Sequence, residues 1–286
     1  MIRSLLSPLR IVVASLGFLV LAAACQPSAP AASDVCTTGS NGEDPVIFVA
    51  GTFSPEFANQ LFFGNRLQAA GFTTCVFELK GDPTVGSIPG TAPIAESADS
   101  LAVFVQDVLA WSGASQVDLV GHSQGAVVAR QYLAFDGGTP YVNDMVSLAG
   151  PHNGSSVANI TALFANAVLT PFGTSCALVA PCAELQENSA AINALNAGDP
   201  TPGNVDYYGF ITEFDEIVWN STDGQETGFL DGGATNVAVQ DECPLRFVGH
   251  TGMILDEAVY QMTADALTGQ PINAPLWACL TPTLPL

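Results

Sequence analysis

A strand that turns into a helix around a single serine is the feature that most limits how this chain can fold. The mostly apolar residues 117–120 lead into the pentapeptide GHSQG at 121–125, and a helical pattern continues over 125–135. A nucleophile elbow consists of these parts, and its flanking glycines leave room at a strained turn. The sequence therefore predicts that Ser123 is presented at the carboxyl edge of a sheet. The alternative is a strand-to-helix turn in which the serine only caps the helix.

Apolar runs of strand length alternate with helical patterns along most of the chain. The expected strands are residues 46–50, 75–79, 117–120, 144–149, 205–212 and 245–248. The expected helices are residues 55–70, 95–111, 125–135 and 255–267. This alternation predicts the α/β class, with a mostly parallel central sheet and helices on both faces.

One long interval, residues 155–204, separates two of the expected strands. It is apolar over 160–169 and again over 190–195. Long intervals of this kind are uncommon unless they are functional, so we interpret this one as a helical cap inserted into a domain that covers residues 44–286. The alternative is a pair of ordinary packing helices without a gating role.

The amino terminus has the composition of an export signal. Arg3 and Arg10 precede an uncharged run over 11–24, which is too short to span a bilayer comfortably. The signal is therefore assigned to residues 1–24.

The end of this signal is compatible with two kinds of processing. Ala22-Ala23-Ala24 fits ordinary signal cleavage, whereas small residues directly before Cys25 resemble a lipobox, in which that cysteine carries a lipid anchor. Residues 25–43 are rich in Pro, Ala, Ser and Gly, which predicts a flexible tether. We expect an exported protein, either a membrane-anchored lipoprotein or a secreted one.

The seven cysteines agree with export. In an oxidising compartment six can pair and one is left over, and Cys25 is the simplest residue to be consumed by lipid. The chain has three histidines and no C-x-x-C motif, so we expect no metal and no cofactor.

The charge balance excludes one class of partner. Six Lys and Arg stand against 27 Asp and Glu, for a formal net charge of −21. A field of this sign repels polyphosphates, so nucleic-acid binding is excluded. We expect a monomer.

A serine hydroxyl needs a general base, and histidine has a suitable pKa. His250 follows the last expected strand, where this architecture requires the base. His122 lies inside the elbow with its side chain directed away from the serine, and we interpret it as a packed core histidine. His152 follows a central strand, but Pro151 and Asn153 indicate a turn.

The base needs an orienting carboxylate located between serine and histidine in chain order. Asp215 is preferred because it closely follows the expected strand 205–212 and has apolar neighbours. In such a loop a buried carboxylate requires a partner. The reserve candidates are Glu213, Glu216, Asp231, Asp241 and Glu242.

The oxyanion formed during acyl transfer requires backbone N–H donors. One is expected from Gln124, directly after the nucleophile, and one from Thr52 in the loop after the first strand, where Gly51 permits close approach.

With these motifs the chain resembles the secreted α/β-hydrolase lipases, both bacterial class 2 lipases and fungal lipase B. The resemblance rests on residues 117–125, 214–218 (FDEIV) and 247–255 (FVGHTGMIL). It implies a serine carboxylic-ester hydrolase acting on an acyl-ester or lipid substrate, with Ser123, Asp215 and His250 as catalytic triad and Thr52 and Gln124 at the oxyanion hole. An acyltransferase, a polyester depolymerase and a non-catalytic lipid-binding surface lipoprotein are the alternatives.

The same resemblance implies the disulfide pairing. Cys36 with Cys75 and Cys243 with Cys279 are similar to bridges of the fungal enzyme, and Cys176 with Cys182 would then pair locally.

Overall fold

The computed structural model describes residues 30–164 and 179–282, and its centre is a seven-stranded sheet. The strand order is β1-β3-β2-β4-β5-β6-β7, and every neighbouring pair is parallel except β1 with β3. The strands are β1 (Cys36–Thr37), β2 (Val46–Val49), β3 (Thr74–Phe77), β4 (Val117–His122), β5 (Val142–Leu148), β6 (Asp206–Ile211) and β7 (Thr235–Ala238). The mostly parallel sheet predicted from the sequence is confirmed.

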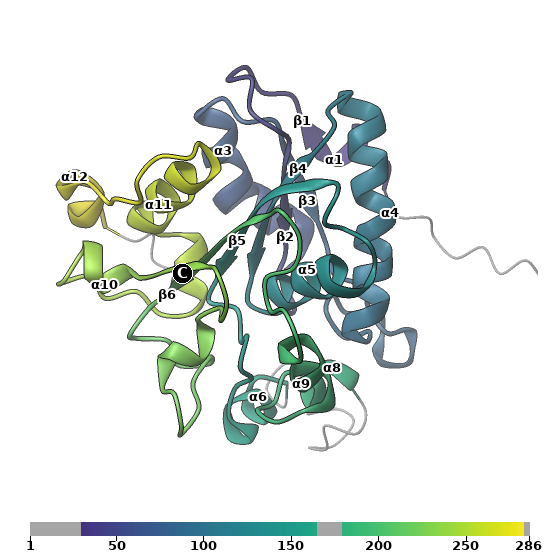
Figure 1. Ribbon diagram of the computed structural model, residues 1–286, viewed down its shortest axis with the longest axis vertical. Helices are drawn as coiled ribbons and strands as arrows, with labels where there is room; N and C mark the ends of the chain where they lie inside the picture. Colours follow the sequence, from purple (N-terminus) through teal and green to yellow (C-terminus); the bar gives the residue numbers. More distant parts are fainter. Residues whose placement is uncertain (1–29, 165–178, 283–286) are drawn as a thin grey trace, which may run out of the picture.

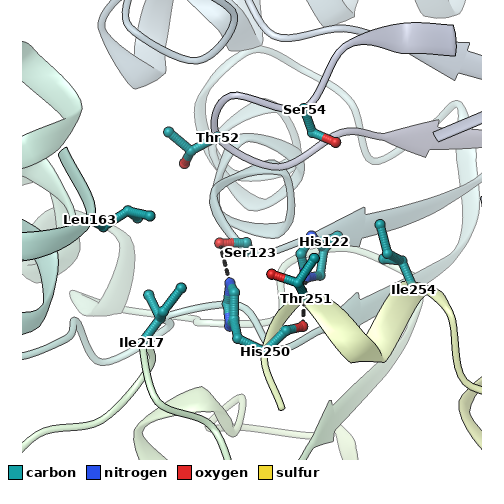
Figure 2. A pocket seen from close by; sticks show the side chains of 9 residues that line it. All are labelled: Thr52, Ser54, His122, Ser123, Leu163, Ile217, His250, Thr251 and Ile254. Carbon is teal, nitrogen blue, oxygen red and sulfur yellow. Dashed lines mark hydrogen bonds between the residues drawn. The ribbon is translucent and has the colours of Figure 1, made fainter. Parts of the chain in front are cut away.

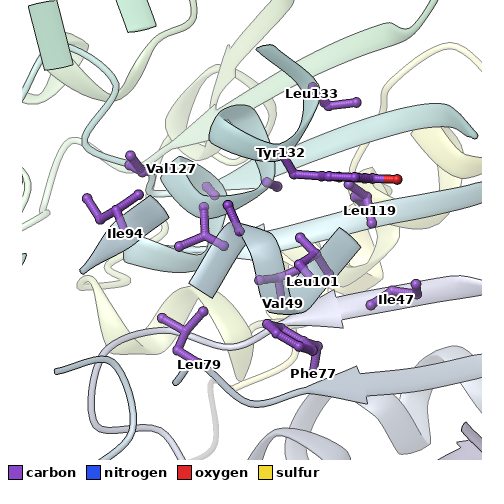
Figure 3. Close-up of a cluster of buried hydrophobic side chains, with 14 of the residues drawn as sticks. Ile47, Val49, Phe77, Leu79, Ile94, Leu101, Leu119, Val127, Tyr132 and Leu133 are labelled. Carbon is purple, nitrogen blue, oxygen red and sulfur yellow. The ribbon is translucent and has the colours of Figure 1, made fainter. Parts of the chain in front are cut away.

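Strand β2 is apolar on both faces because each face of the sheet is covered by helices. In β2 all four residues are buried, and alternate side chains enter different cores. Ile47 and Val49 belong to the core that contains Leu101 and Val127 (Figure 3), whereas Val46 and Phe48 belong to the opposite core. Side chains alternate between the faces of a strand, so a continuous apolar run is the sequence signature of this arrangement.

Two layers of helices sandwich the sheet. Figure 1 shows α4 (Ile94–Ser112) and α5 (Gln124–Phe135) beside one face, and α3 (Asn65–Ala69) and α11 (Glu257–Leu267) beside the other. The shorter helical elements are α1 (Ala32–Val35), α2 (Glu56–Asn59), the π-helical turn η1 (Gln60–Gly64), α10 (Val239–Glu242), the 3₁₀ turns η2 (Pro83–Val85), η5 (Gln225–Gly228) and η6 (Thr251–Ile254), and α12 (Leu276–Leu280). Within the described ranges, no helix has both the length and the apolar character needed to span a bilayer.

The interval predicted to form a cap contains three described helices, α6 (Val157–Phe164), α8 (Ala180–Glu184) and α9 (Ala190–Asn196), which lie together at one end of the molecule (Figure 1). Helices α8 and α9 bury Cys182 and Leu195 in the core formed with α4 and α5. The carboxylate of Glu184 also accepts the backbone N–H of Ile94 at the start of α4, at 2.9 Å. Helices α8 and α9 are therefore packing elements of the main domain.

The last expected strand, residues 245–248, is wrong, because the chain there is irregular. Arg246 turns inward, where its guanidinium Nε donates to Asp256 Oδ2 at 2.6 Å, and both side chains are buried. Its neighbours Leu245 and Phe247 are correspondingly 88% and 74% exposed. The sheet instead ends at β7, a strand that was not among those expected from the sequence.

The expected tether over residues 25–43 is wrong for residues 32–37, which belong to the fold. Ala32 of α1 is buried in a hydrophobic core, and β1 pairs antiparallel with β3, Cys36 opposite Cys75. Cys25 and the export signal lie outside the described residues.

Two disulfides tie peripheral segments to the domain. Cys36 is bonded to Cys75 and Cys243 to Cys279, with sequence separations of 39 and 36 residues. In the loop-entropy account each contributes roughly 4 kcal/mol to stability. The third expected pair, Cys176 with Cys182, includes Cys176, which lies outside the described residues.

Two buried carboxyl groups face each other between neighbouring strands. Asp118 of β4 accepts the backbone N–H of Asp144 of β5 at 3.1 Å. Burial, followed by the charges of Asp144 and Asp44, raises the pKa of Asp118 from 3.8 to about 9. Burial and the charge of Asp206 likewise raise the pKa of Asp144 to about 6.

The carboxyl pair is expected to weaken the fold as the pH rises. Because both folded-state pKa values lie above the unfolded value of 3.8, the protonated pair stabilises the fold at low pH, and this contribution is lost as the pH rises towards 9. We expect Asp118→Asn to raise the free energy of unfolding at pH 8 by roughly 1 to 3 kcal/mol and to flatten its pH dependence. Urea unfolding of the oxidised protein at several pH values measures this. The exposed Asp107→Asn is the control, and equal pH dependence in both variants would contradict the expectation.

Candidate active site

The nucleophile elbow is present as the sequence predicted. Ser123 lies between β4 and α5 with φ 55° and ψ −125°, a strained conformation for a residue with a side chain. A β-carbon on Gly121 would lie 2.5 Å from the Cα of Ala126, and one on Gly125 would lie 2.2 Å from the carbonyl oxygen of Val49. Only glycine fits at these two positions, and the turn directs the serine hydroxyl into a pocket (Figure 2).

Three side chains from three separate loops form one hydrogen-bonded chain. The Nε2 atom of His250 lies 2.8 Å from Ser123 Oγ, and its Nδ1 atom lies 2.9 Å from Asp215 Oδ2 and 3.1 Å from Oδ1. A carboxylate can only accept, so Nδ1 carries the proton and Nε2 is free to accept from the serine hydroxyl. All three residues are buried.

The loop after β6 holds Asp215 in place. Its Oδ1 atom accepts the backbone N–H groups of Ile217 at 2.9 Å and Val218 at 2.7 Å. These bonds fix the carboxylate plane toward the imidazole. The acid is thus both oriented and hydrogen-bonded, as a buried carboxylate requires.

The charge of the acid loop acts on the base. Burial of His250 acts to lower its pKa by disfavouring the imidazolium, but the charge and hydrogen bond of Asp215, with the charge of Glu216, outweigh it. The pKa of His250 is therefore raised above the ordinary value of 6.5. The surroundings of His250 therefore favour its protonated imidazole.

The two other histidines lie outside this hydrogen-bonded chain. His122 is buried, and its Nε2 atom lies 3.1 Å from the backbone carbonyl oxygen of His250 (Figure 2). His152 is buried with Nε2 2.6 Å from Ser147 Oγ and Nδ1 3.4 Å from the guanidinium of Arg130. Burial lowers the pKa of both, with His250 adding to the effect at His122 and Arg130 at His152.

Among the described carboxylates, Asp215 alone hydrogen-bonds the ring of His250. The other acids considered for this position are Glu213, Glu216, Asp231, Asp241 and Glu242. Glu216 contacts the backbone N–H of His250 instead of its ring. Asp241 accepts the backbone N–H of Ala238, directly before α10, and Glu242 accepts that of Ala274, well after it.

Thr52 and Gln124 are joined above the serine. The Thr52 hydroxyl donates to Gln124 Oε1 at 2.6 Å, which links the loop after β2 to the start of α5. Gln124 is the first residue of α5, so its backbone N–H has no partner within the helix.

A small pocket of about 90 Å³ opens at the serine. Beside Ser123 and His250 it is lined by Thr52, Ser54, His122, Leu163, Ile217, Thr251 and Ile254 (Figure 2). Leu163 comes from α6, so the first helix of the inserted interval contributes to the pocket wall. The apolar lining was not predictable from the sequence, because single aliphatic residues in loops carry no recognisable pattern. In the described part of the chain, no group of three or more His, Cys, Asp or Glu side chains is arranged to hold a metal.

The fold is shared with known hydrolases. The structure is similar to Aspergillus fumigatus lipase B, with a TM-score of 0.65 and 18% identity over 85% of this chain and 58% of that one. It is also similar to an esterase from Exiguobacterium antarcticum, with a TM-score of 0.53 and 14% identity over 82% of this chain and 94% of that one. Together the sheet, the elbow and the residues around it define an α/β-hydrolase.

A family comparison identifies the group within this fold. The model of the family "Lipase (class 2)" matches residues 43–261, and the chain belongs to this family. Triacylglycerol lipases of Burkholderia plantarii and Pseudarthrobacter phenanthrenivorans are 31% and 32% identical over 49% and 40% of this chain. The chain aligns with 37% and 35% of the length of these relatives.

Proposed function

We propose that the protein is a serine carboxylic-ester hydrolase that cleaves acyl esters through an acyl-enzyme on Ser123. The observation that carries this proposal is the continuous hydrogen-bonded chain from Ser123 Oγ through His250 to Asp215. It lies at a pocket with an apolar wall, which suits the acyl part of an ester. Membership of the class 2 lipase family supports the same reaction class.

The geometry supports a two-step reaction. Ser123 Oγ attacks the ester carbonyl carbon while His250 Nε2 takes the hydroxyl proton, and Asp215 stabilises the imidazolium. The tetrahedral intermediate then breaks its bond to the alcohol oxygen, which receives that proton from His250. Water repeats the sequence on the acyl-enzyme, releasing the carboxylic acid and restoring the serine.

The negative oxygen of the intermediate requires donors on the other side of the pocket. In this proposal the backbone N–H groups of Thr52 and Gln124 provide them. The bond between the Thr52 hydroxyl and the Gln124 side chain supports this role, because it holds the two backbone segments together. Preorganised donors of this kind are often the largest single contribution to acyl-transfer catalysis.

The proposed substrates are acyl esters of lipid type. Two curated relatives are named triacylglycerol lipase, and Leu163, Ile217 and Ile254 give the pocket an apolar lining. Export, a lipid on Cys25 and a monomeric state remain predictions from the sequence.

Hydrolysis of p-nitrophenyl esters of increasing acyl length, together with labelling by a fluorophosphonate probe, tests the function. We expect turnover and stoichiometric labelling at Ser123, located by peptide mass spectrometry. A protein that binds lipid vesicles without turnover or labelling would instead be a binding module, and the proposal would be rejected.

The raised pKa of His250 predicts where activity is lost at low pH. Only the neutral imidazole can accept the serine proton, so kcat/KM should rise with pH through the pKa of His250, with its midpoint above 6.5. Esterase assays from about pH 5 to pH 8 measure the midpoint. The pKa of His122, lowered to about 3 by burial and by His250, places its titration outside this range. A midpoint below 6.5 would contradict the expectation.

A further inference from the structure

The backbone of His250 is held from both sides by side chains. Its N–H group donates to Glu216 Oε2 at 2.9 Å, and its carbonyl oxygen lies 3.1 Å from His122 Nε2. His122 directly precedes Ser123 in the chain, and Glu216 directly follows Asp215. The segment that carries Ser123 and the loop that carries Asp215 therefore each also contact the main chain of His250.

These contacts matter because His250 is not placed by a strand. It follows the irregular segment 244–249 and lies just before the 3₁₀ turn η6. Irregular segments have greater freedom than sheet strands. The ring must nevertheless stay 2.8 Å from Ser123 Oγ and 2.9 Å from Asp215 Oδ2.

The contact from His122 has a defined chemistry. A backbone carbonyl can only accept, so His122 Nε2 carries the proton and donates. Its Nδ1 atom is buried without a hydrogen-bond partner among the described residues. The pKa of His122, lowered to about 3, keeps the ring neutral, although the two imidazole centroids are only 4.9 Å apart. His122 can therefore hold the loop without placing a positive charge beside the imidazolium of His250.

The contact from Glu216 depends on a glycine. A β-carbon on Gly249 would lie 2.8 Å from Glu216 Oε2, so a larger residue there would push the carboxylate away from the His250 N–H. The backbone carbonyl of Glu216 in turn accepts the side-chain amide of Asn159 on α6 at 3.3 Å. The acid loop is thus tied both to the histidine and to the inserted interval.

We propose that His122 and Glu216 are positioning residues, which fix the main chain of His250 so that its ring reaches Ser123 and Asp215 together. The expected effect on kcat rests on the proposed function, whereas the expected effect on the position of the His250 ring does not. Loss of either contact lets the histidine loop shift relative to its partners. A displacement of about 1 Å in an active site can lower the rate by about 100-fold.

Substitutions at Glu216 and at Gly249, which lies beside its carboxylate, test the contact between Glu216 and the backbone N–H of His250. We expect Glu216→Ala to lower kcat by about 10- to 100-fold with KM changed by less than about twofold. Glu216→Gln keeps an oxygen acceptor and should recover most of this loss. Gly249→Ala retains the carboxylate but displaces it, and should resemble Glu216→Ala. Glu213→Ala, which removes an exposed carboxylate from the same loop, is the matched control.

The second contact is tested at His122. His122→Leu removes the donor and is expected to lower kcat as Glu216→Ala does. His122→Gln keeps an N–H donor and should retain more activity. Because His122 is buried, the thermal midpoint of each variant is measured, and only variants folded at the assay temperature are compared.

A proton NMR measurement separates this inference from the proposed function. The downfield resonance of the His250 Nδ1 proton reports the bond to Asp215, and we expect it in the wild type and its weakening or loss in Glu216→Ala. Normal kcat and an unchanged resonance in Glu216→Ala would overturn the inference, as would equal losses in the Ala and Gln variants. Absence of ester turnover in a wild type that shows the resonance would reject the proposed function alone.

Discussion

Replacing Ser123 with alanine is expected to lower kcat for ester hydrolysis by about 10⁵- to 10⁶-fold. The variant lacks the oxygen that forms the acyl-enzyme, and no other hydroxyl is known to contact His250 Nε2 in the described structure. What remains is the rate supported by substrate binding and the oxyanion donors. Initial rates with a p-nitrophenyl ester, with fluorophosphonate labelling as a second readout, measure the loss.

Ser54→Ala is the matched control for this experiment. Ser54 also lines the pocket, but its hydroxyl donates to Asn59 Oδ1 at 3.0 Å and is not part of the Ser123–His250 chain. We expect kcat within about threefold of the wild type and full labelling. Equal activity of Ser123→Ala and wild type would reject the triad assignment.

Replacing Asp215 with asparagine has the second largest expected effect, a loss in kcat of about 10⁴-fold. The amide can donate to Nδ1, which favours the imidazole tautomer with its proton on Nε2. That nitrogen could no longer accept the proton of Ser123. The charge that favours the imidazolium is also lost, so any residual activity should titrate at a lower pH than in the wild type.

Glu213→Gln serves as the control for Asp215→Asn. It removes one negative charge from the same loop while leaving the described bonds of Asp215 to Ile217 and Val218 intact. A near-normal rate in Asp215→Asn would move the role of the acid to another carboxylate of this region. Glu216 would be the first candidate, because it is the adjacent residue and already contacts the His250 backbone.

The innermost strands of the sheet were predictable because burial on both faces favours apolar residues, which a short stretch of sequence reveals. Strands buried on both faces favour continuous apolar runs, and residues 46–49 are apolar and buried throughout. Residues 142–148 are buried except for Asn143, although Asp144 and Ser147 are polar. Strand β7 has no such signature, since Thr235 and Asn236 are exposed at the edge. A long-range pairing with β6 defines this strand, and local composition does not encode that pairing.

The error at residues 245–248 has a different cause. The apolar residues Leu245, Phe247 and Val248 favour a strand over 245–248. In the structure Arg246 instead points inward, because its guanidinium pairs with the buried carboxylate of Asp256. A buried ion pair across ten residues cannot be inferred from the alternation of apolar and polar positions.

The residues of the candidate site were predictable from chain order, but their backbone contacts were not. Loops that follow parallel strands meet at one edge, which brings the segments of Ser123, Asp215 and His250 together. From the sequence, His122 is expected to be only a core residue, and Glu216 only an alternative to Asp215. Their contacts with the His250 main chain depend on loop geometry that no residue pattern specifies.

The short strand β1 is expected to link the oxidation state of Cys36 and Cys75 to self-association of the protein. It covers the outer edge of β3 with only two residues, and the bond between Cys36 and Cys75 keeps it there. An uncovered strand edge presents unpaired backbone groups that can template pairing between chains. Reduction of this bond is thus expected to expose the outer edge of β3 as a surface for pairing between chains.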